Sequence, residues 1–287
     1  MRLPPVRRQA GAERLSVCAA HLNPIRWCPS VKAAFNLSKW YLDCITDLGD
    51  ASIAYIGMVD WGPIRIHCSS ILENTAQLVS ARYSMRPQTE PSIDHGSLHW
   101  RSRALKIDGE WRADSPAIRQ TVFASDDGLV EWQCFMPRAR ARIGTRIGLG
   151  YAEHLRMTIA PWRMPIRTLR WGRFSTGSDW IVWIDWLGDF TRRIVYRNGQ
   201  AAPTSLIEDG QIGFGDGARL TMDRSLVLRD GPLGTAALSA IPGIRRTFPA
   251  RLLNVNECKW RSRACLERPG EPSAEGWAIH ERVEWPK

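Results

Sequence analysis

From residue 37 onward, apolar and polar residues alternate in short runs that are separated by Gly, Pro and Asp. Alternation with a period of two indicates strands that bury one face, and the separating residues are typical of turns. The runs lie at 39–44, 51–59, 64–72, 98–107, 118–124, 129–136, 149–159, 168–174, 180–186, 192–197, 218–222, 224–229, 257–267 and 276–285. Only Gly234–Ile241 is typical of a helix, and a Pro-Gly pair ends it. The pattern therefore predicts an all-β fold.

Many short strands at even spacing are typical of antiparallel β-barrels and sandwiches, and the chain is long enough for two of them. The pentapeptide Trp100-Arg-Ser-Arg-Ala104 recurs as Trp260-Arg-Ser-Arg-Ala264. We interpret this identity as a duplication and predict that both copies lie on matching strands of two similar barrels, with the Trp buried and the Arg solvated. The first β-domain is expected at 36–147 and the second at 148–287, with their junction near 145–165.

Residues 1–35 differ from the rest because they lack strand alternation. Six Lys or Arg and one Glu lie there, so half of the net charge of +10 falls in this segment. Pro and Arg interrupt its apolar residues, which is unlike the continuous apolar region of a signal peptide. We expect a poorly ordered basic leader that can be removed without loss of folding.

The composition, with 44% apolar and 24% charged residues, is that of a globular protein. Outside the leader the positive charge is thinly spread with no long basic block, which argues against a nucleic-acid partner. The sequence pI of about 9.7 is compatible with weak attraction to anionic membrane surfaces. No apolar run is long enough to span a bilayer.

The seven Cys are scattered and form no Cys-x-x-Cys motif, which favours reduced thiols in the cytoplasm over a disulfide framework or a zinc ribbon. His95-Gly-Ser-Leu-His99 has ligand-type residues but is typical of a loop, and a further ligand cannot be assigned to it. Nothing in the chain matches a nucleotide-binding loop. We therefore expect neither a metal nor a cofactor.

The strand predicted at 180–186 carries a carboxyl group among Trp residues. Its apolar face, which includes Trp180 and Trp186, is expected in a core, whereas Trp183 and Asp185 share the other face. Burial in such a pocket would raise the pKa of Asp185 and keep it protonated, as a general acid requires. The alternative is an Asp185 that only begins the following turn and is solvated.

The segment Gly148-Leu-Gly-Tyr151-Ala-Glu153-His154 places Glu153 and His154 on opposite faces of one strand, so only one of them can line a given cavity. We favour His154, with a hydrogen-bonded core histidine as the alternative. Trp171 and Arg173 share a face of the next strand, where Arg173 could pair with Glu153 or hold Asp185 ionised.

The Gly148–His154 segment resembles the Gly-x-Gly-Tyr-x-Asp-His-x-Trp-Gly signature of the carotenoid 1,2-hydratase (hydroxyneurosporene synthase) and AttH-like family. The match covers Gly148, Gly150, Tyr151 and His154, whereas Glu and Arg stand where the family has Asp and Trp. The hydratases carry their proposed proton donor in a later Tyr-x-Asp strand, which corresponds here to Trp183-Ile-Asp185. The resemblance implies two lipocalin-like β-barrel domains in one chain.

The residues and the resemblance together predict a set of candidate site residues. The candidate catalytic residues are Asp185, His154, Glu153 and Tyr151, and the candidate substrate-binding residues are Trp183, Trp171, Arg173, Tyr41 and Asp43. The expected function is a cofactor-independent enzyme, a hydro-lyase or a cyclase. It would protonate an alkene of a carotenoid-like or polyketide substrate. The alternative is a non-catalytic lipocalin-like carrier of a hydrophobic small molecule, and the sequence leaves both open.

Overall fold

A computed structural model describes residues 35–75, 78–236, 238, 243, 246 and 248–286. The basic leader predicted at 1–35 lies outside the described residues apart from Phe35, and so does half of the helix predicted at Gly234–Ile241. The described residues 234–236 form a turn. Short helical segments occur at Pro161–Arg163 (η1, a 3-10 turn) and Ala250–Leu253 (α2). None of the described helices is long and apolar enough to cross a bilayer.

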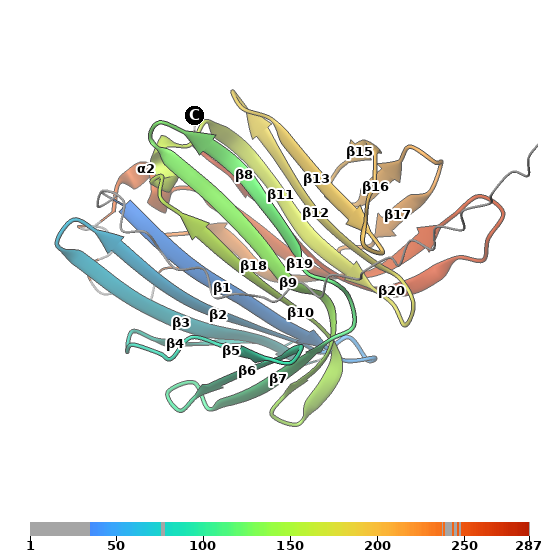
Figure 1. Cartoon of the computed structure of the whole chain (residues 1–287), viewed down its shortest axis with the longest axis horizontal. Coiled ribbons are helices and arrows are strands. Elements are labelled where there is room, and N and C mark those ends of the chain that lie inside the picture. The colour runs from blue at the N-terminus through green and yellow to red at the C-terminus, as the bar shows by residue number, and fades with distance from the viewer. Residues whose placement is uncertain are drawn as a thin grey trace, which may run out of the picture. The chain divides into compact units, whose positions relative to one another are not determined.

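Ten strands of the described chain form a first antiparallel sheet. Their bounds are β1 Phe35–Ile45, β2 Ala51–Trp61, β3 Ile64–Thr75, β4 Leu78–Ser84, β5 Ser92–Asp94, β6 Ser97–Ser102, β7 Ile107–Ala113, β8 Ile118–Ser125, β9 Gly128–Ile143 and β10 Arg146–Met157. The strand order is β4-β3-β2-β1-β10-β9-β7-β6-β5, and β8 pairs with β9. Figure 1 shows the sheet strongly twisted and curled, as expected when long antiparallel strands bury one concave face.

Ten further described strands form a second sheet of the same kind. Their bounds are β11 Ile166–Ser175, β12 Trp180–Gly188, β13 Arg192–Arg197, β14 Gln200–Ala201, β15 Thr204–Ile207, β16 Gln211–Phe214, β17 Arg219–Met222, β18 Leu226–Pro232, β19 Asn256–Glu267 and β20 Ala274–Glu284. The order β14-β13-β12-β11-β20-β19-β17-β16-β15, with β18 on β19, repeats the first sheet strand for strand. The predicted all-β fold of two lipocalin-like antiparallel sheets is confirmed.

The pentapeptide repeat does not follow this duplication. Trp100 lies on β6 and Trp260 on β19, whereas the strand that matches β19 in the first sheet is β9. The prediction of matching strands was therefore wrong, because alternation of buried and exposed residues is shared by many strands. A repeat that does match is Gly150-Tyr-Ala-Glu-His154 on β10 and Gly276-Trp-Ala-Ile-His280 on β20. Its glycines are required, since an added Cβ would meet the carbonyl of Asp43 on β1 or of Ser175 on β11.

The change from one sheet to the other occurs at residues 158–165, which contain η1. The expected domain boundary after residue 147 falls inside β10, and β10 pairs with β1 and β9 of the first sheet. The described residues of both sheets belong to one compact unit.

Alternate residues of the central strands face different cores. On β1, Trp40 and Leu42 lie in a core enclosed by the first sheet, whereas Tyr41 lies in a core shared by both sheets. On β12, Trp183 lies in a core enclosed by the second sheet, whereas Trp186 joins the shared core. These strands are thus buried on both faces, which explains their nearly continuous apolar sequences.

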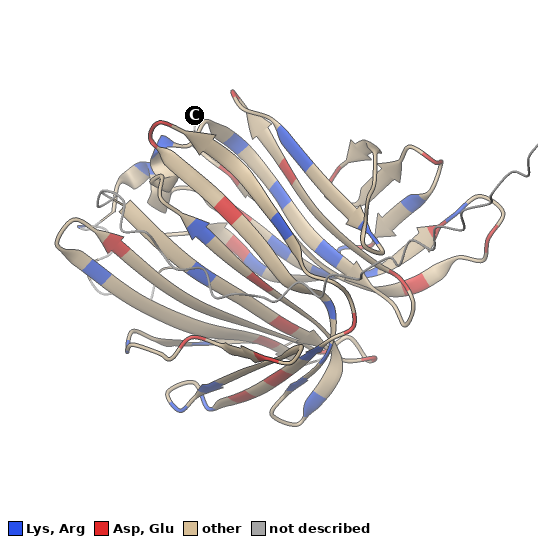
Figure 2. Cartoon of the chain, viewed as in Figure 1, with Lys and Arg blue, Asp and Glu red and all other residues tan. Residues whose placement is uncertain are grey.

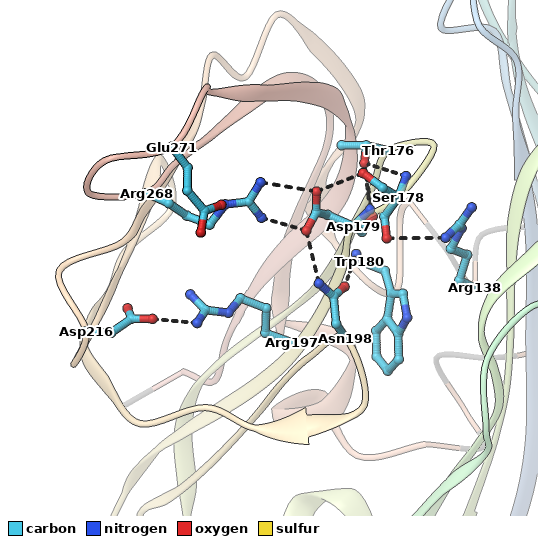
Figure 3. Close-up of polar contacts among 10 residues, drawn as sticks. All are labelled: Arg138, Thr176, Ser178, Asp179, Trp180, Arg197, Asn198, Asp216, Arg268 and Glu271. Carbon is cyan, nitrogen blue, oxygen red and sulfur yellow. Dashed lines mark hydrogen bonds and ion pairs between the residues drawn. The ribbon is translucent and has the colours of Figure 1, made fainter.

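The turn between β11 and β12 is held by a polar network (Figure 3). The Asp179 carboxylate accepts hydrogen bonds from Arg268 Nη1 at 2.6 Å and from Asn198 Nδ2 at 3.0 Å. Arg138 of β9 donates to the backbone carbonyl of Ser178 at 3.4 Å, so a side chain of the first sheet holds a turn of the second. These partly exposed contacts fix the position of the turn relative to β9 and β19.

Charged side chains of both signs are intermixed along the strands of both sheets (Figure 2). Several Arg side chains are paired across strands with carboxylates, such as Arg82 with Glu73 at 2.7 Å and Arg101 with Asp108 at 2.9 Å. Such exposed pairs each contribute little to stability. Because Arg and acidic side chains are intermixed, the high Arg content does not produce a single cationic face on the described strands that Figure 2 shows.

Candidate functional site

A cavity of about 340 Å³ lies in the shared core between the two sheets. This volume falls within the range of small-molecule sites. Most of its wall is apolar, and polar side chains gather in one part of it. It is lined by Phe35, Leu37, Lys39, Tyr55, Gly57, Val59, Ile66, Cys68, Ser70, Val130, Leu155, Met157, Pro161, Met164, Leu169, Trp186, Arg229, Leu233, Leu238, Phe248, Leu252, Glu257, Glu281, Val283 and Trp285.

The strand register sorts the wall into layers. One layer of the first sheet consists of Leu37, Val59 and Ile66, which lie opposite one another on β1, β2 and β3. Four positions further along β2 and β3, the polarity changes: Tyr55 lies opposite Ser70 on β3. We call the apolar layer the mouth and the polar part around Tyr55 the floor. A molecule that fills both would be apolar over most of its length.

Tyr55 is the centre of the floor. Three cations surround its ring: Lys39 Nζ at 5.4 Å, Arg229 at 5.7 Å and Lys259 Nζ at 5.8 Å from the ring centroid. Its hydroxyl is buried and has no hydrogen-bond partner within the described part of the chain. Burial raises the pKa of Tyr55 well above its ordinary value. The hydroxyl is therefore a neutral donor that lacks an acceptor.

Lys259 lies behind the floor with only 1% of its side chain exposed. Its ammonium group contacts Glu281 and lies 3.5 Å from the Glu257 carboxylate, and both of these acids line the cavity. Burial lowers the pKa of Lys259 to about 8, although Glu257 acts in the opposite direction. Burial acts to raise the pKa of Glu257. The positive charges of Lys259 and Arg229 outweigh this effect, so the pKa of Glu257 is lowered. This cluster can exchange a proton near neutral pH.

Beyond the floor the shared core is sealed by a buried ion pair. Arg173 of β11 donates to both carboxylate oxygens of Asp43 on β1, at 2.6 and 3.0 Å, and both side chains are fully buried. Tyr41 donates its hydroxyl proton to Asp43 at 3.1 Å. Burial opposes the charge on Arg173, but Asp43 raises its pKa above the ordinary value. Arg173 thus pairs with neither Glu153 nor Asp185, and we call this pair with Tyr41 the sealed layer.

Glu153 extends the sealed layer on β10. One of its carboxylate oxygens accepts hydrogen bonds from the Tyr151 hydroxyl at 2.5 Å, Trp132 Nε1 at 2.5 Å and Trp171 Nε1 at 3.2 Å. Burial raises the pKa of Glu153 despite these donors. The structure therefore brings together Glu153, Tyr151 and Trp171 in a bonded network that does not line the cavity.

His154 points away from this network, as the alternation required. It lies in the first sheet's own core, where its Nε2 is 2.8 Å from the Ser38 hydroxyl and its ring packs 4.7 Å from that of Trp40. Burial lowers its pKa to about 4, so it is neutral at physiological pH. The matching His280 makes the same contact with Ser262, at 2.8 Å. The choice of His154 over Glu153 for the shared core was wrong.

Asp185 also lies away from the cavity. Its side chain shares a face with Trp183 inside the second sheet's own core, and it accepts a hydrogen bond from Arg193 Nε at 3.0 Å. The opposite face of β12 presents Trp186 to the cavity. The expectation that Asp185 opens into a cavity shared with His154 or Tyr151 was therefore wrong, because both faces of this strand are buried and its apolar face is the one directed at the ligand space.

The sequence did not single out the floor residues. Tyr55 stands in an apolar strand where a hydroxyl is inconspicuous. Glu257 and Lys259 alternate with Cys258 and Trp260 on β19, which is the signature of a strand with one charged and one apolar face. That charged face would ordinarily be solvated, and only tertiary packing turns it inward. No group of three or more His, Cys, Asp or Glu that could hold a metal is found in the described ranges.

Comparisons with known proteins support the fold. No protein-family model and no curated protein sequence matches the chain. The chain is similar to the crystal structure of CghA with Sch210972, with a TM-score of 0.52 at 11% identity over 88% of this chain and 89% of CghA. It is also similar to kievitone hydratase from Nectria haematococca, with a TM-score of 0.51 at 11% identity over 86% and 88% of the two chains. The likeness extends over both sheets and shows a shared fold.

Proposed function

We propose that the chain is a hydratase- or cyclase-type enzyme that acts on a largely apolar small molecule bound in the cavity between the sheets. The observation that carries the proposal is the combination of an apolar mouth with a floor that holds a buried Lys259 and a Tyr55 hydroxyl without a partner among the described residues. Perturbed ionisable groups at the end of an apolar cavity are typical of catalytic sites. One solved structure of this fold is named as a hydratase.

The floor suits acid-assisted chemistry on an alkene conjugated to a carbonyl. Tyr55 would donate a hydrogen bond to the carbonyl oxygen and draw electron density from the alkene. Glu281, which contacts Lys259 and lines the cavity, is placed to pass a proton to the substrate. In a hydration, water adds its oxygen to the electron-poor carbon and returns a proton to Glu281. In a cyclisation, a second alkene of the same molecule attacks the electron-poor carbon instead, and the cation that results loses a proton to Glu281.

Carotenoid-like polyenes and polyketides both meet this description, because both combine long apolar segments with conjugated alkenes. A lipocalin-like carrier is the second candidate. The observation in its favour is the mouth, where the layer of Leu37, Val59 and Ile66 offers no reactive group. A carrier would bind the same class of molecule and release it unchanged.

The test starts from lipophilic extracts that contain polyenes and polyketides, incubated with the protein in water enriched in heavy oxygen. Compounds that bind or change are identified by untargeted mass spectrometry. We expect either a product that carries the label, which indicates hydration, or an isomer of unchanged mass and new retention, which indicates cyclisation. Recovery of a bound compound in unchanged form with every extract would favour the carrier and contradict the enzyme.

The matched variants are Tyr55→Phe and Tyr196→Phe. Tyr55→Phe keeps the ring and removes the donor, so turnover should fall by roughly 100-fold. Tyr196 does not line the cavity, and its hydroxyl accepts a hydrogen bond from Gln120 at 2.7 Å. Tyr196→Phe should therefore keep its turnover. Equal rates in both variants would remove Tyr55 from the mechanism.

A further inference from the structure

Two hydrogen-bond donors in the cavity wall are buried without a partner among the described residues: the Tyr55 hydroxyl and the Trp285 indole N–H. Buried polar groups in native proteins nearly always have a partner. Leaving a buried donor without an acceptor is unfavourable. Each of these two atoms therefore marks a place where an acceptor on a ligand would be bound favourably.

The two donors lie toward different ends of the cavity. Glu281, Val283 and Trp285 face the cavity at alternate positions of one extended segment. At about 3.3 Å per residue, Glu281 and Trp285 are separated by about 13 Å of chain. Tyr55 belongs to the Glu281 end, because Lys259 contacts Glu281 and lies 5.8 Å from the Tyr55 ring centroid. The donors are thus on the order of 10 Å apart.

The wall between the donors is apolar. Leu155 and Met157 line it from β10, and Leu169 and Val283 line it from β11 and β20. Methylene, methyl or alkene groups satisfy such a wall, whereas a polar group in the middle of the ligand would lose its hydrogen bonds to water.

We propose that the cavity binds an elongated, apolar molecule with two hydrogen-bond-accepting oxygens, one bonded by the Tyr55 hydroxyl and one by the Trp285 N–H. The proposal rests on the proposed function only in taking the same cavity as the ligand site. Selection of this ligand class is a property of binding and holds for an enzyme or for a carrier.

The Tyr55 end favours the more electron-rich of the two oxygens. Lys39 and Arg229 lie 5.4 and 5.7 Å from the Tyr55 ring centroid and place positive charge there. Burial keeps the Tyr55 hydroxyl protonated by raising its pKa, so it acts as a donor. A carbonyl or enol oxygen suits this end, and any neutral acceptor suits Trp285.

The experiment uses three linear probes of equal chain length: an alkane, a monoketone, and a diketone with its carbonyl groups about 10 Å apart. The probes compete for the protein, and the bound fractions are measured by mass spectrometry after gel filtration. One hydrogen bond contributes roughly 1 kcal/mol net, so each carbonyl should increase retention by roughly fivefold. Equal retention of all three probes by the unmodified protein would overturn the proposal.

Two variants assign the two sites. Tyr55→Phe and Trp285→Phe should each remove one of the two increments, and the double variant should retain diketone and alkane alike. Trp277→Phe is the control, since its indole N–H donates to the Asp47 carbonyl at 3.2 Å and the ring does not line the cavity. Full preference for the diketone in the double variant would also overturn the proposal.

This experiment separates the inference from the proposed function. If the protein prefers the diketone but converts no component of the extracts, the inferred ligand class stands and the proposed enzymatic activity is contradicted. If the protein converts a substrate but retains the three probes equally, the proposed enzymatic activity stands and the two-acceptor inference is contradicted.

Discussion

The floor and the sealed layer lie on adjacent strands, β2 beside β1 and β20 beside β11, yet their polar groups are arranged differently. In the sealed layer, the Asp43 carboxylate accepts two hydrogen bonds from Arg173 and a third from Tyr41, and one nitrogen of Arg173, Nη1, is buried without a partner among the described residues. In the floor, the Tyr55 hydroxyl is a buried donor that has no hydrogen-bond partner within the described chain. Tyr41 of the sealed layer also lies close to the floor, since the centroid of its ring is 5.7 Å from Lys259 Nζ.

The difference separates structural from functional burial. A polar group whose bonds are all made inside the protein has nothing left for a ligand, and its loss is felt as instability. A polar group with an unused donor gains from a ligand, and its loss is felt as reduced binding or turnover. The comparison predicts that variants of the two layers will fail in different assays.

The largest effect is expected in the sealed layer. Arg173→Met would leave the Asp43 carboxylate buried without its partner, which costs roughly 3–5 kcal/mol of unfolding free energy. Urea unfolding measures this. Tyr55→Phe in the floor should stay within about 1 kcal/mol of the unmodified protein, because its hydroxyl has no bond to lose. A stable Arg173→Met variant would show that the sealed layer is not structural.

Acid should destabilise the protein through its buried histidines. The pKa of His154 is about 4 and that of His280 about 3, both lowered chiefly by burial. Between pH 6.5 and 4 the two histidines are protonated in the unfolded chain but stay neutral in the folded chain. Their contribution to stability is therefore fully present above about pH 6.5 and is lost as the pH drops. For His154 the loss is about 3 kcal/mol.

Unfolding free energies at a series of pH values check this prediction, with His154→Gln as the comparison. The Gln variant should show a shallower fall between pH 6.5 and 4, because one of the two groups no longer titrates. Identical slopes for the two proteins would mean that His154 is protonated equally in the folded and the unfolded state.

Turnover at the floor should fall at alkaline pH, whereas stability falls in acid. Lys259 has a pKa lowered to about 8 by burial, so its ammonium form, which supplies the proton, disappears above that pH. We expect turnover to fall as the pH rises through about 8. Lys259→Met should lose roughly 100-fold in turnover and this limb of the profile. Lys39→Met is the matched control: it should keep the limb because Lys259 is intact, but at a higher pH, because the charge of Lys39 helps to lower the pKa of Lys259.

The smallest effect is expected at Asp185. Its carboxylate is bonded to Arg193 on the face of β12 that points away from the cavity. Asp185→Asn should therefore keep turnover within roughly twofold, with at most a modest loss of stability. Kinetics of the purified variant measure this, and a loss of 100-fold with stability unchanged would restore Asp185 as the general acid.

Alternation along the chain predicted the strands and the relative directions of neighbouring side chains. Glu153 and His154 do point to opposite faces, and Trp186 does lie opposite Asp185 across β12. What alternation could not decide is which of two buried faces meets the other sheet. Both faces of such strands are apolar, so the sequence gives no preference between a core and a ligand space.

The floor escaped prediction for a second reason. Its members come from strands far apart in the chain: Tyr55 on β2, Lys259 on β19 and Glu281 on β20. None of them carries a local motif, and the burial that shifts their pKa values arises only when the two sheets pack. The motif that the sequence did offer, around Tyr151 and Glu153, belongs to the sealed layer.

The central claim, that the ligand occupies the cavity between the sheets, is tested most directly by filling it. Gly57 lines the cavity, and a Cβ there would meet only the carbonyl oxygens of Cys68 and Ser38, at 3.6 and 3.9 Å. Gly57→Leu should therefore fold while occupying ligand space. Gly177→Leu is the control, since a Cβ there meets nothing within 4 Å and Gly177 lies outside the cavity.

The measurement is retention of the diketone probe by the two variants, alongside their unfolding free energies. The account predicts at least tenfold weaker retention in Gly57→Leu, with stability equal to or above that of the unmodified protein, and unchanged retention in Gly177→Leu. Unchanged retention in a stably folded Gly57→Leu variant would place the ligand elsewhere and contradict the account.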